Sequence, residues 1–181
     1  MAWITKPSGT MRIERRSEPY LTQAMRDELS RTHLPRYETR MSATMPALHM
    51  VQQAYHWIPP QALEEIAAFL GLAPAEVLDC ASFYEEYWLK RRGRRLIGVC
   101  RSIACEVCGH AEITKACTRR LGVEPGETTD DEGWTLVELE CLGSCGTAPV
   151  ALIDHDLHEN LTPESIVRLI DEAERGGGAR H

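Results

Sequence analysis

The chain contains 181 residues, which is enough for one ordinary domain or two small ones. Its 43% hydrophobic and 26% charged residues are typical of a globular protein with a buried core, and the net charge of −7 argues against nucleic acid as a partner. Apolar runs fall short of a membrane span and the first residues lack the apolar segment of a secretory signal. We therefore expect a cytoplasmic protein without direct membrane insertion.

The first half of the chain has helical patterns. Residues 1–18 show no periodicity and are predicted to form a loose N-terminal arm. After them apolar residues recur at helical spacing, and Pro60, Gly71 and Pro74 separate the short segments. We predict a small helical bundle over residues 19–92.

Four aromatic residues lie near the end of this bundle: Phe83, Tyr84, Tyr87 and Trp88. Aromatic side chains dominate both protein cores and interfaces. The sequence therefore leaves open whether they pack the bundle or dock a partner.

The basic segment KRRGRR at 90–95 marks a boundary between two domains. A nucleic-acid patch would also be basic, but this segment contains no aromatic residue and the chain is acidic overall. A solvated linker is the better interpretation.

The periodicity changes after this segment. A short apolar run at 96–99 predicts a strand that ends at Cys100, and a later alternating run predicts a strand that ends at Cys141. A helix is predicted between them, and a hairpin and a last helix follow. The order β-α-β-β-α predicts a compact α/β domain over residues 93–181, so the whole chain is of the α+β class.

Seven cysteines are present, at positions 80, 100, 105, 108, 117, 141 and 145. Their odd number and the missing secretion signal argue against a disulfide framework. Cys100 and Cys105 enclose four residues, and Cys141 and Cys145 enclose three. Four thiolates from two loops suit either a zinc ion or an iron–sulfur cluster, and the wide spacing of both pairs favours the cluster without excluding zinc.

The text around these pairs resembles a known family. The matching segments are VCRSIACEVCGHAEI, LGVEPGETTDDEGWTLVELECLGSCGTAPV and LTPESIVRLIDE, with PALHMVQQAYHWIPPQALEEIAAFLGLAPAEVLDCASFYEEYW upstream. Together they resemble, over about residues 42–174, the thioredoxin-like [2Fe–2S] ferredoxin family. Its best-known members are the small peripheral iron–sulfur subunits of NADH-oxidising complexes such as respiratory complex I.

This resemblance implies a thioredoxin-like fold for the second domain and a [2Fe–2S] cluster held by Cys100, Cys105, Cys141 and Cys145. It also implies that the cluster exchanges single electrons with the FMN of a partner subunit that binds FMN and NADH. The chain contains no nucleotide-binding fingerprint, so we expect an electron carrier with no catalytic residues and no substrate site of its own.

The resemblance does not identify the host complex. Complex I would place the chain at the cytoplasmic face of a membrane through the other subunits. Similar subunits also occur in soluble NAD-linked hydrogenases, including electron-bifurcating ones, and in NAD-dependent formate dehydrogenases.

Cys108 departs from the family pattern. It lies shortly after Cys105, so these two residues could instead serve a thiol–disulfide enzyme, although a spare thiol beside the ligand loop is the simpler interpretation. A zinc-stabilised interaction module without a redox role is the alternative from another class. Cys80 and Cys117 are predicted to be buried thiols.

Small and charged residues near the cysteines should tune the site. Gly143, Gly146 and Ala104 permit close approach of backbone N–H groups. Glu140 should lower the reduction potential, and Arg101 should raise it.

Overall fold

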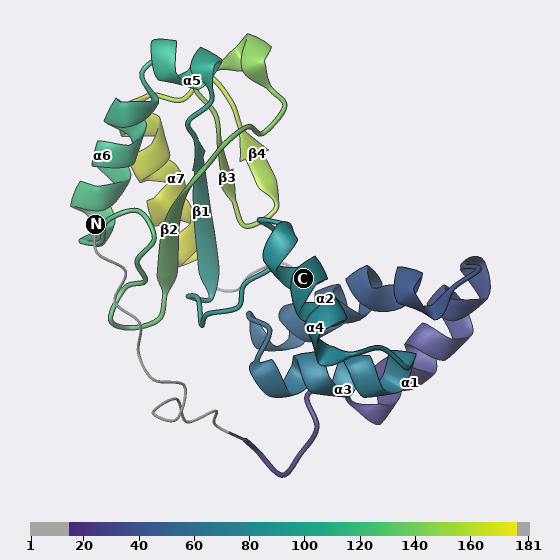
Figure 1. Ribbon diagram of the computed structural model, residues 1–181. Helices are drawn as coiled ribbons and strands as arrows, with labels where there is room; N and C mark the ends of the chain where they lie inside the picture. Colours follow the sequence, from purple (N-terminus) through teal and green to yellow (C-terminus); the bar gives the residue numbers. More distant parts are fainter. Residues whose placement is uncertain (1–14, 177–181) are drawn as a thin grey trace, which may run out of the picture. The chain divides into compact units, whose positions relative to one another are not determined.

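A computed structural model describes residues 15–176 (Figure 1). The chain divides into two compact units, a helical unit (Met1–Arg91) and a sheet unit (Arg92–His181), and the boundary lies inside the basic segment. Residues 1–14 of the predicted arm lie outside the described residues.

The described part of the helical unit, from residue 15 onwards, contains four α-helices: α1 (Gln23–Glu28), α2 (Thr44–Tyr55), α3 (Pro60–Leu70) and α4 (Pro74–Phe83). Three shorter helical turns, η2 (Leu29–His33), η3 (Leu34–Arg36) and η4 (Arg40–Ala43), join α1 to α2. Pro60 and Pro74 occupy first helical positions, where no backbone N–H is needed. Gly71 ends α3 with φ of 73°, a left-handed conformation that favours glycine.

One apolar core holds these helices together, and its fully buried members include Leu48, Val51 and Ile66. Gln52 is a buried polar residue of α2. Its side-chain amide donates to the carbonyl of Glu86 and accepts from the N–H of Trp88, both at 2.8 Å. Gln52 therefore fixes the segment that follows α4.

The four aromatics divide between core and surface. Tyr87 is 7% exposed and belongs to the core, whereas Phe83 is 80% exposed and Tyr84 43% exposed. Trp88 is half-buried. Tyr87 thus packs the bundle, whereas docking of a partner by the exposed Phe83 and Tyr84 stays a prediction.

The chain is attached to the rest of the helical unit from Arg15 onwards, within the segment assigned to the arm. The Arg15 guanidinium pairs with the Glu64 carboxylate at 2.7 Å. The Arg16 guanidinium lies 3.7 Å from the centre of the Tyr20 ring and donates to the Tyr55 hydroxyl at 2.8 Å. The Arg16 backbone exchanges hydrogen bonds of 3.0 and 3.2 Å with the Gln61 side chain. These contacts give residues 15–18 a fixed path in place of the loose arm expected from the sequence.

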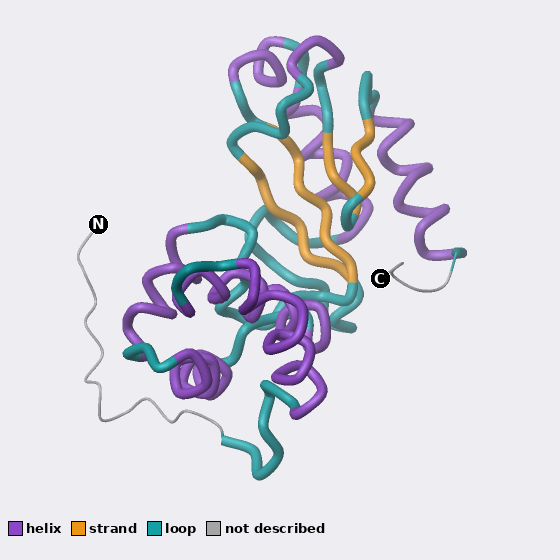
Figure 2. The backbone as a smooth tube through the Cα atoms, turned by 90° about the vertical axis from the view of Figure 1, so that its right-hand side faces the viewer, coloured by secondary structure: helices purple, strands orange, loops and turns teal. Residues whose placement is uncertain are grey.

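The sheet unit contains β1 (Arg95–Cys100), β2 (Trp134–Leu139), β3 (Ala151–Ile153) and β4 (Asp156–His158) in the order β2-β1-β3-β4 (Figure 2). β1 and β2 are parallel, and the other pairs are antiparallel. Between β1 and β2 lie α5 (Ile103–Val107) and α6 (His110–Leu121). The turn η5 (Cys145–Thr147) precedes β3, and α7 (Pro163–Arg175) is the last element of the described residues.

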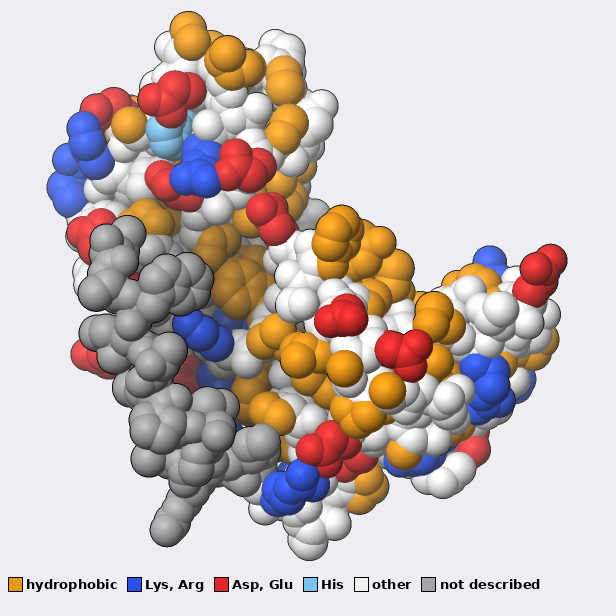
Figure 3. Space-filling view, in the orientation of Figure 1, with side chains coloured by type: hydrophobic (Ala, Val, Ile, Leu, Met, Phe, Trp, Pro, Cys, Tyr) orange, Lys and Arg blue, Asp and Glu red, His pale blue; other side chains and the backbone are white. Residues whose placement is uncertain are grey.

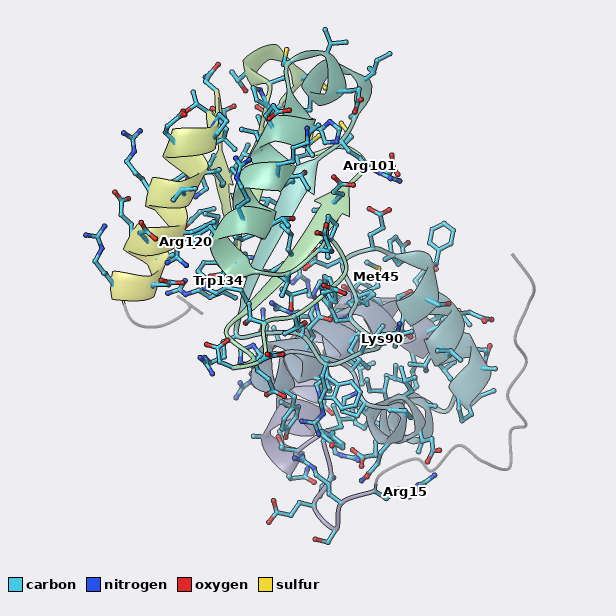
Figure 4. The ribbon with its side chains drawn as sticks, turned by 90° about the vertical axis from the view of Figure 1, so that its left-hand side faces the viewer. Arg15, Met45, Lys90, Arg101, Arg120 and Trp134 are labelled. Atoms are coloured by element: carbon cyan, nitrogen blue, oxygen red, sulfur yellow. The ribbon has the colours of Figure 1, made fainter. Side chains whose placement is uncertain are left out.

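The helices α6 and α7 pack side by side on one face of the sheet (Figure 1). Alternate strand residues face them, and the fully buried core members are Ile97, Val99, Leu136, Ala151, Cys117, Ile166 and Ile170. At the far end of these helices Arg120 pairs with Asp171 at 2.8 Å and with Glu174 at 2.6 Å, near Trp134 (Figure 4). The predicted α+β class is confirmed.

The described helices include none that is by itself long and apolar enough to cross a membrane; α3 and α4 meet the length and composition test only together, as a pair bent by 120°.

Candidate metal centre

The loops that follow β1 and β2 lie at one end of the sheet (Figure 1), and four cysteines lie in or beside these loops. β1 and β2 are parallel, so their carboxyl ends lie at the same edge, and the antiparallel β3 begins there. Cys100 is the last residue of β1, and Cys105 lies in α5, directly after it. Cys141 follows β2, and Cys145 opens η5 on the way to β3. Both predicted pairs therefore meet at this edge.

The first pair is buried. Cys100 is 2% exposed and Cys105 is 1% exposed, and both pack with Val150 against Leu142 and Ala148. The Cys100 N–H donates to the Val150 carbonyl at 3.1 Å, which ties the end of β1 to the start of β3. Burial, with a smaller contribution from the neighbouring Cys100 thiol, raises the pKa of Cys105 to about 11.

The second pair is exposed. The sulfur atoms of Cys141 and Cys145 lie 3.9 Å apart, and the Gly143 N–H donates to the Cys141 sulfur at 3.4 Å. This N–H and the Cys145 thiol lower the pKa of Cys141, whereas the Cys141 thiol raises the pKa of Cys145. Gly143 has φ of 78°, so a side chain would be strained where the backbone turns its N–H onto the sulfur.

The thiols are thus arranged as two pairs. The Cys145 thiol contributes to the raised pKa of Cys105, so the pairs are close enough to interact electrostatically. Within residues 15–176, no three or more His, Cys, Asp or Glu side chains converge closely enough to hold one metal ion. Two pairs of soft donors fit a cluster with two irons, because each iron takes two thiolates.

The three remaining cysteines are Cys80, Cys108 and Cys117, and Cys108 is the one beside the two pairs. Cys117 is fully buried in α6, as predicted, and burial raises its pKa to about 12. Cys80 is half-buried against the helical core, so the predicted burial is only partial. Cys108 is exposed, and its N–H closes α5 on the Ala104 carbonyl at 3.0 Å. Cys108 is thus placed beside the site as an exposed thiol.

A family model described as "Thioredoxin-like [2Fe-2S] ferredoxin" matches residues 30–174. The chain belongs to this family. Its cofactor is a [2Fe–2S] cluster, and the donor set at the end of the sheet suits that group.

Relatives among curated proteins extend this match. One subunit of the NADH-quinone oxidoreductase of Escherichia coli is 34% identical over 155 residues, which cover 86% of this chain and 93% of the relative. The mitochondrial NADH dehydrogenase [ubiquinone] flavoprotein 2 of Dictyostelium discoideum is 40% identical over 134 residues. That match covers 74% of this chain and 54% of the relative, so the chain spans about half the length of this protein.

Among solved structures, a NAD+-reducing [NiFe]-hydrogenase in its air-oxidized state resembles the chain with a TM-score of 0.64 at 26% identity. The match covers 75% of this chain and 23% of the hydrogenase chain. Three quarters of the chain is therefore similar to one part of a longer protein.

Two opposite charges lie next to Cys100 and Cys141 in the sequence. The Arg101 guanidinium contacts the Glu140 carboxylate through two nitrogens, with Nε at 3.0 Å from Oε1. Figure 4 shows Arg101 at the end of the sheet where β1 and β2 finish. The charges expected to act in opposite directions on the cluster are thus an ion pair, so each partly offsets the other.

His110 links the two elements that lead to the thiols. Its Nδ1 lies 2.7 Å from Glu106 on α5, and its Nε2 lies 3.6 Å from Glu138 on β2. Thr114 donates to the same Glu138 carboxylate at 3.0 Å. The sequence showed no sign of this link, because its members lie 4 to 32 positions apart on three elements.

Ser144, Thr147 and Glu159 form a second polar contact around the exposed cysteines. Sequence patterns did not single out these residues. The predicted hairpin returns the chain to the end of the sheet where the cysteines lie. This was the only pattern in the sequence that could have placed Glu159 near them.

Proposed function

We propose that Cys100, Cys105, Cys141 and Cys145 hold the [2Fe–2S] cluster and that the chain carries single electrons in an NADH dehydrogenase-type complex. The observation that carries this proposal is the meeting of the two cysteine pairs at one end of the sheet. The bound cluster supplies a site that accepts and releases one electron. The protein's part is to hold four thiolates, bury one pair and direct the Gly143 N–H onto a sulfur.

The proposed partner is a flavoprotein subunit that binds FMN and NADH and exchanges electrons with the cluster. The names of the relatives, an NADH-quinone oxidoreductase and an NADH dehydrogenase flavoprotein, support this assignment. The chain contains no nucleotide-binding fingerprint, so its electrons come from another protein of the complex. In such a complex the chain lies on the cytoplasmic side and reaches a membrane only through its partners.

A second candidate host is a soluble NAD-linked hydrogenase. The structural similarity to a NAD+-reducing [NiFe]-hydrogenase favours it. A formate dehydrogenase is a third host for the same type of electron carrier. Purification of the tagged chain from its own cells distinguishes the three: quinone-reducing membrane proteins, a nickel–iron protein or a formate-oxidising protein would accompany it.

The cluster itself is tested on the isolated chain. After reconstitution we expect equal amounts of iron and sulfide, a visible absorption band and, after dithionite reduction, the low-temperature EPR signal of a reduced [2Fe–2S] cluster. Serine at position 100, 105, 141 or 145 should abolish or alter that signal. Cys108→Ser is the matched control and should leave it unchanged.

Three results would contradict this assignment. A colourless protein with one zinc ion and no sulfide would make the chain a zinc-stabilised module. Loss of the cluster in Cys108→Ser would show that Cys108 is a ligand and that the proposed set of four is wrong. Insulin-reducing activity that depends on Cys108 would indicate a thiol–disulfide enzyme.

A further inference from the structure

One carboxylate holds the turn that contains Cys145. Glu159 directly follows β4, and its Oε1 accepts hydrogen bonds from the Ser144 hydroxyl and, at 2.5 Å, from the Thr147 hydroxyl. The two hydroxyl oxygens lie 2.8 Å apart. Each hydroxyl has a single proton, and the short distances to the carboxylate assign both protons to Glu159.

The backbone keeps Glu159 in this place. The Asn160 N–H donates to the Thr147 carbonyl at 2.8 Å, and the Leu161 N–H donates to the Pro149 carbonyl at 3.0 Å. The chain after β4 therefore runs alongside the chain that leads from Cys145 into β3. Hydrogen bonds from Ser144 and, to a smaller extent, Thr147 lower the pKa of Glu159, so its carboxylate is charged at neutral pH.

The turn that contains Cys145 needs such support more than the segment that contains Cys100 and Cys105 does. Cys100 and Cys105 are fixed by burial, whereas Cys145 is exposed and lies in a 3₁₀ turn of only three residues. Ser144 precedes Cys145 directly, and Thr147 follows it by two positions. The carboxylate thus holds the turn on both sides of the thiol without contacting the sulfur.

We propose that Glu159 is a positioning residue for the metal centre, which fixes the direction of the Cys145 thiol by bracing Ser144 and Thr147. This inference rests on the proposed function, because it assigns the thiol to the cluster. A turn released from Glu159 would let the exposed Cys145 leave the cluster more often and admit water or a chelator in its place.

The test uses the reconstituted full chain and measures iron loss to an added chelator together with the EPR line shape. Glu159→Ala should lose iron about tenfold faster, as expected from removing hydrogen bonds to a charged acceptor, and its EPR signal should broaden. Glu159→Gln keeps an oxygen acceptor without the charge and should fall between Glu159→Ala and wild type. Asp156→Ala removes an exposed acid from the same hairpin and should match wild type.

A second series addresses the hydroxyls. The double variant Ser144→Ala, Thr147→Val should lose iron as fast as Glu159→Ala, and adding Glu159→Ala to it should change nothing further. This series also decides the question if Glu159→Ala alone does not fold.

Three outcomes would overturn the inference. The first is an equal rate of iron loss in Glu159→Ala and wild type, and the second is a full effect of Glu159→Ala when it is added to the double variant. The third is an equal shift of reduction potential in Glu159→Gln and Glu159→Ala with an unchanged rate of iron loss. A wild-type chain that binds no cluster would instead contradict the proposed function.

Discussion

Burial separates the four site cysteines into two kinds. Cys100 and Cys105 are held by apolar packing, so their direction follows from the small apolar cluster that they form with Val150. Cys141 and Cys145 are exposed, and hydrogen bonds hold their loop instead. Charge changes near the exposed pair should therefore alter the reduction potential of the cluster, because no apolar layer separates this pair from the surface.

The ion pair of Arg101 and Glu140 offers a direct test of this electrostatic effect. Glu140→Gln should raise the reduction potential, because it removes a negative charge near a site that becomes more negative on reduction. At roughly 10 Å and an effective dielectric constant of about 20, Coulomb's law gives ~1.7 kcal/mol, or ~70 mV as an upper value for an exposed charge. Arg101→Gln should lower the potential, and the double variant should return towards wild type.

Potentiometric titration followed by EPR measures all four proteins. A potential that falls in Glu140→Gln, or variants whose shifts have the same sign, would contradict this account.

Cys117 should make the stability of the protein depend on alkaline pH. Burial raises its pKa to about 12. An unfolded thiol titrates near ~8.5, so above that pH the unfolded chain has lost a proton that the folded chain retains, and this costs up to ~1.4 kcal/mol per pH unit. The stabilisation is thus complete below ~8.5 and declines as the pH rises towards the folded value.

Urea unfolding of the metal-free chain at several pH values between about 8 and about 10 measures this slope. Cys117→Ala should be less stable at neutral pH because of the lost volume, but its stability should decline less steeply with pH. Parallel curves for the two proteins would show that Cys117 does not titrate as proposed.

At the scale of elements, strand direction decides which loops meet. The parallel pairing of β1 and β2 places the loops after both strands at one edge, and the hairpin of β3 and β4 brings Glu159 to the same edge. At the opposite edge, where the chain enters the sheet unit, Gly93 is packed closely against β2. There the Gly93 N–H donates to the buried Thr135 hydroxyl at 2.7 Å.

Gly93→Ala should destabilise the sheet unit. A Cβ at this position would lie 2.7 Å from the Trp134 carbonyl carbon and 2.8 Å from its nitrogen, and backbone cannot move aside as a flexible side chain can. We expect a loss of about 1–3 kcal/mol in unfolding free energy, as for overpacking of a core. Gly146→Ala is the matched control for the metal-free chain, because a Cβ at Gly146 meets no atom within 4 Å. Equal urea midpoints for both variants and wild type would contradict the proposed clash.

At the scale of the whole molecule, the sequence predicted where helices begin and end better than it predicted which residues contact one another. Pro60, Pro74 and Gly71 act locally, so the helix boundaries they set could be predicted from the sequence. Gln52 and Glu159 act across 34 and 15 positions respectively, through contacts that exist only after folding. The ligand set was available from family resemblance, whereas the residues that brace it were not.

An exposed apolar pair beside the thiols also escapes sequence patterns, because such spacing on a helix normally indicates a core. Ile103 and Val107 are 81% and 82% exposed on α5, the helix that contains Cys105. Figure 3 shows apolar side chains at the surface of the end of the sheet unit where α5 lies in Figure 1. Apolar surface next to exposed ligands is suited to a protein that must approach closely to exchange electrons.

We therefore expect Ile103→Ser and Val107→Ser to slow electron transfer from the proposed flavoprotein partner, once NADH has reduced it, and to weaken its binding, since each removes apolar contact area. The cluster potential and EPR signal should remain unchanged, because neither side chain is charged. Leu157→Ser, which changes an apolar residue 42% exposed on β4, is the matched control. Stopped-flow reduction of the cluster at increasing flavoprotein concentration separates binding from transfer. Unchanged kinetics in both α5 variants would place the docking surface elsewhere on the chain, whereas altered potentials would show that the substitutions disturb the metal centre itself.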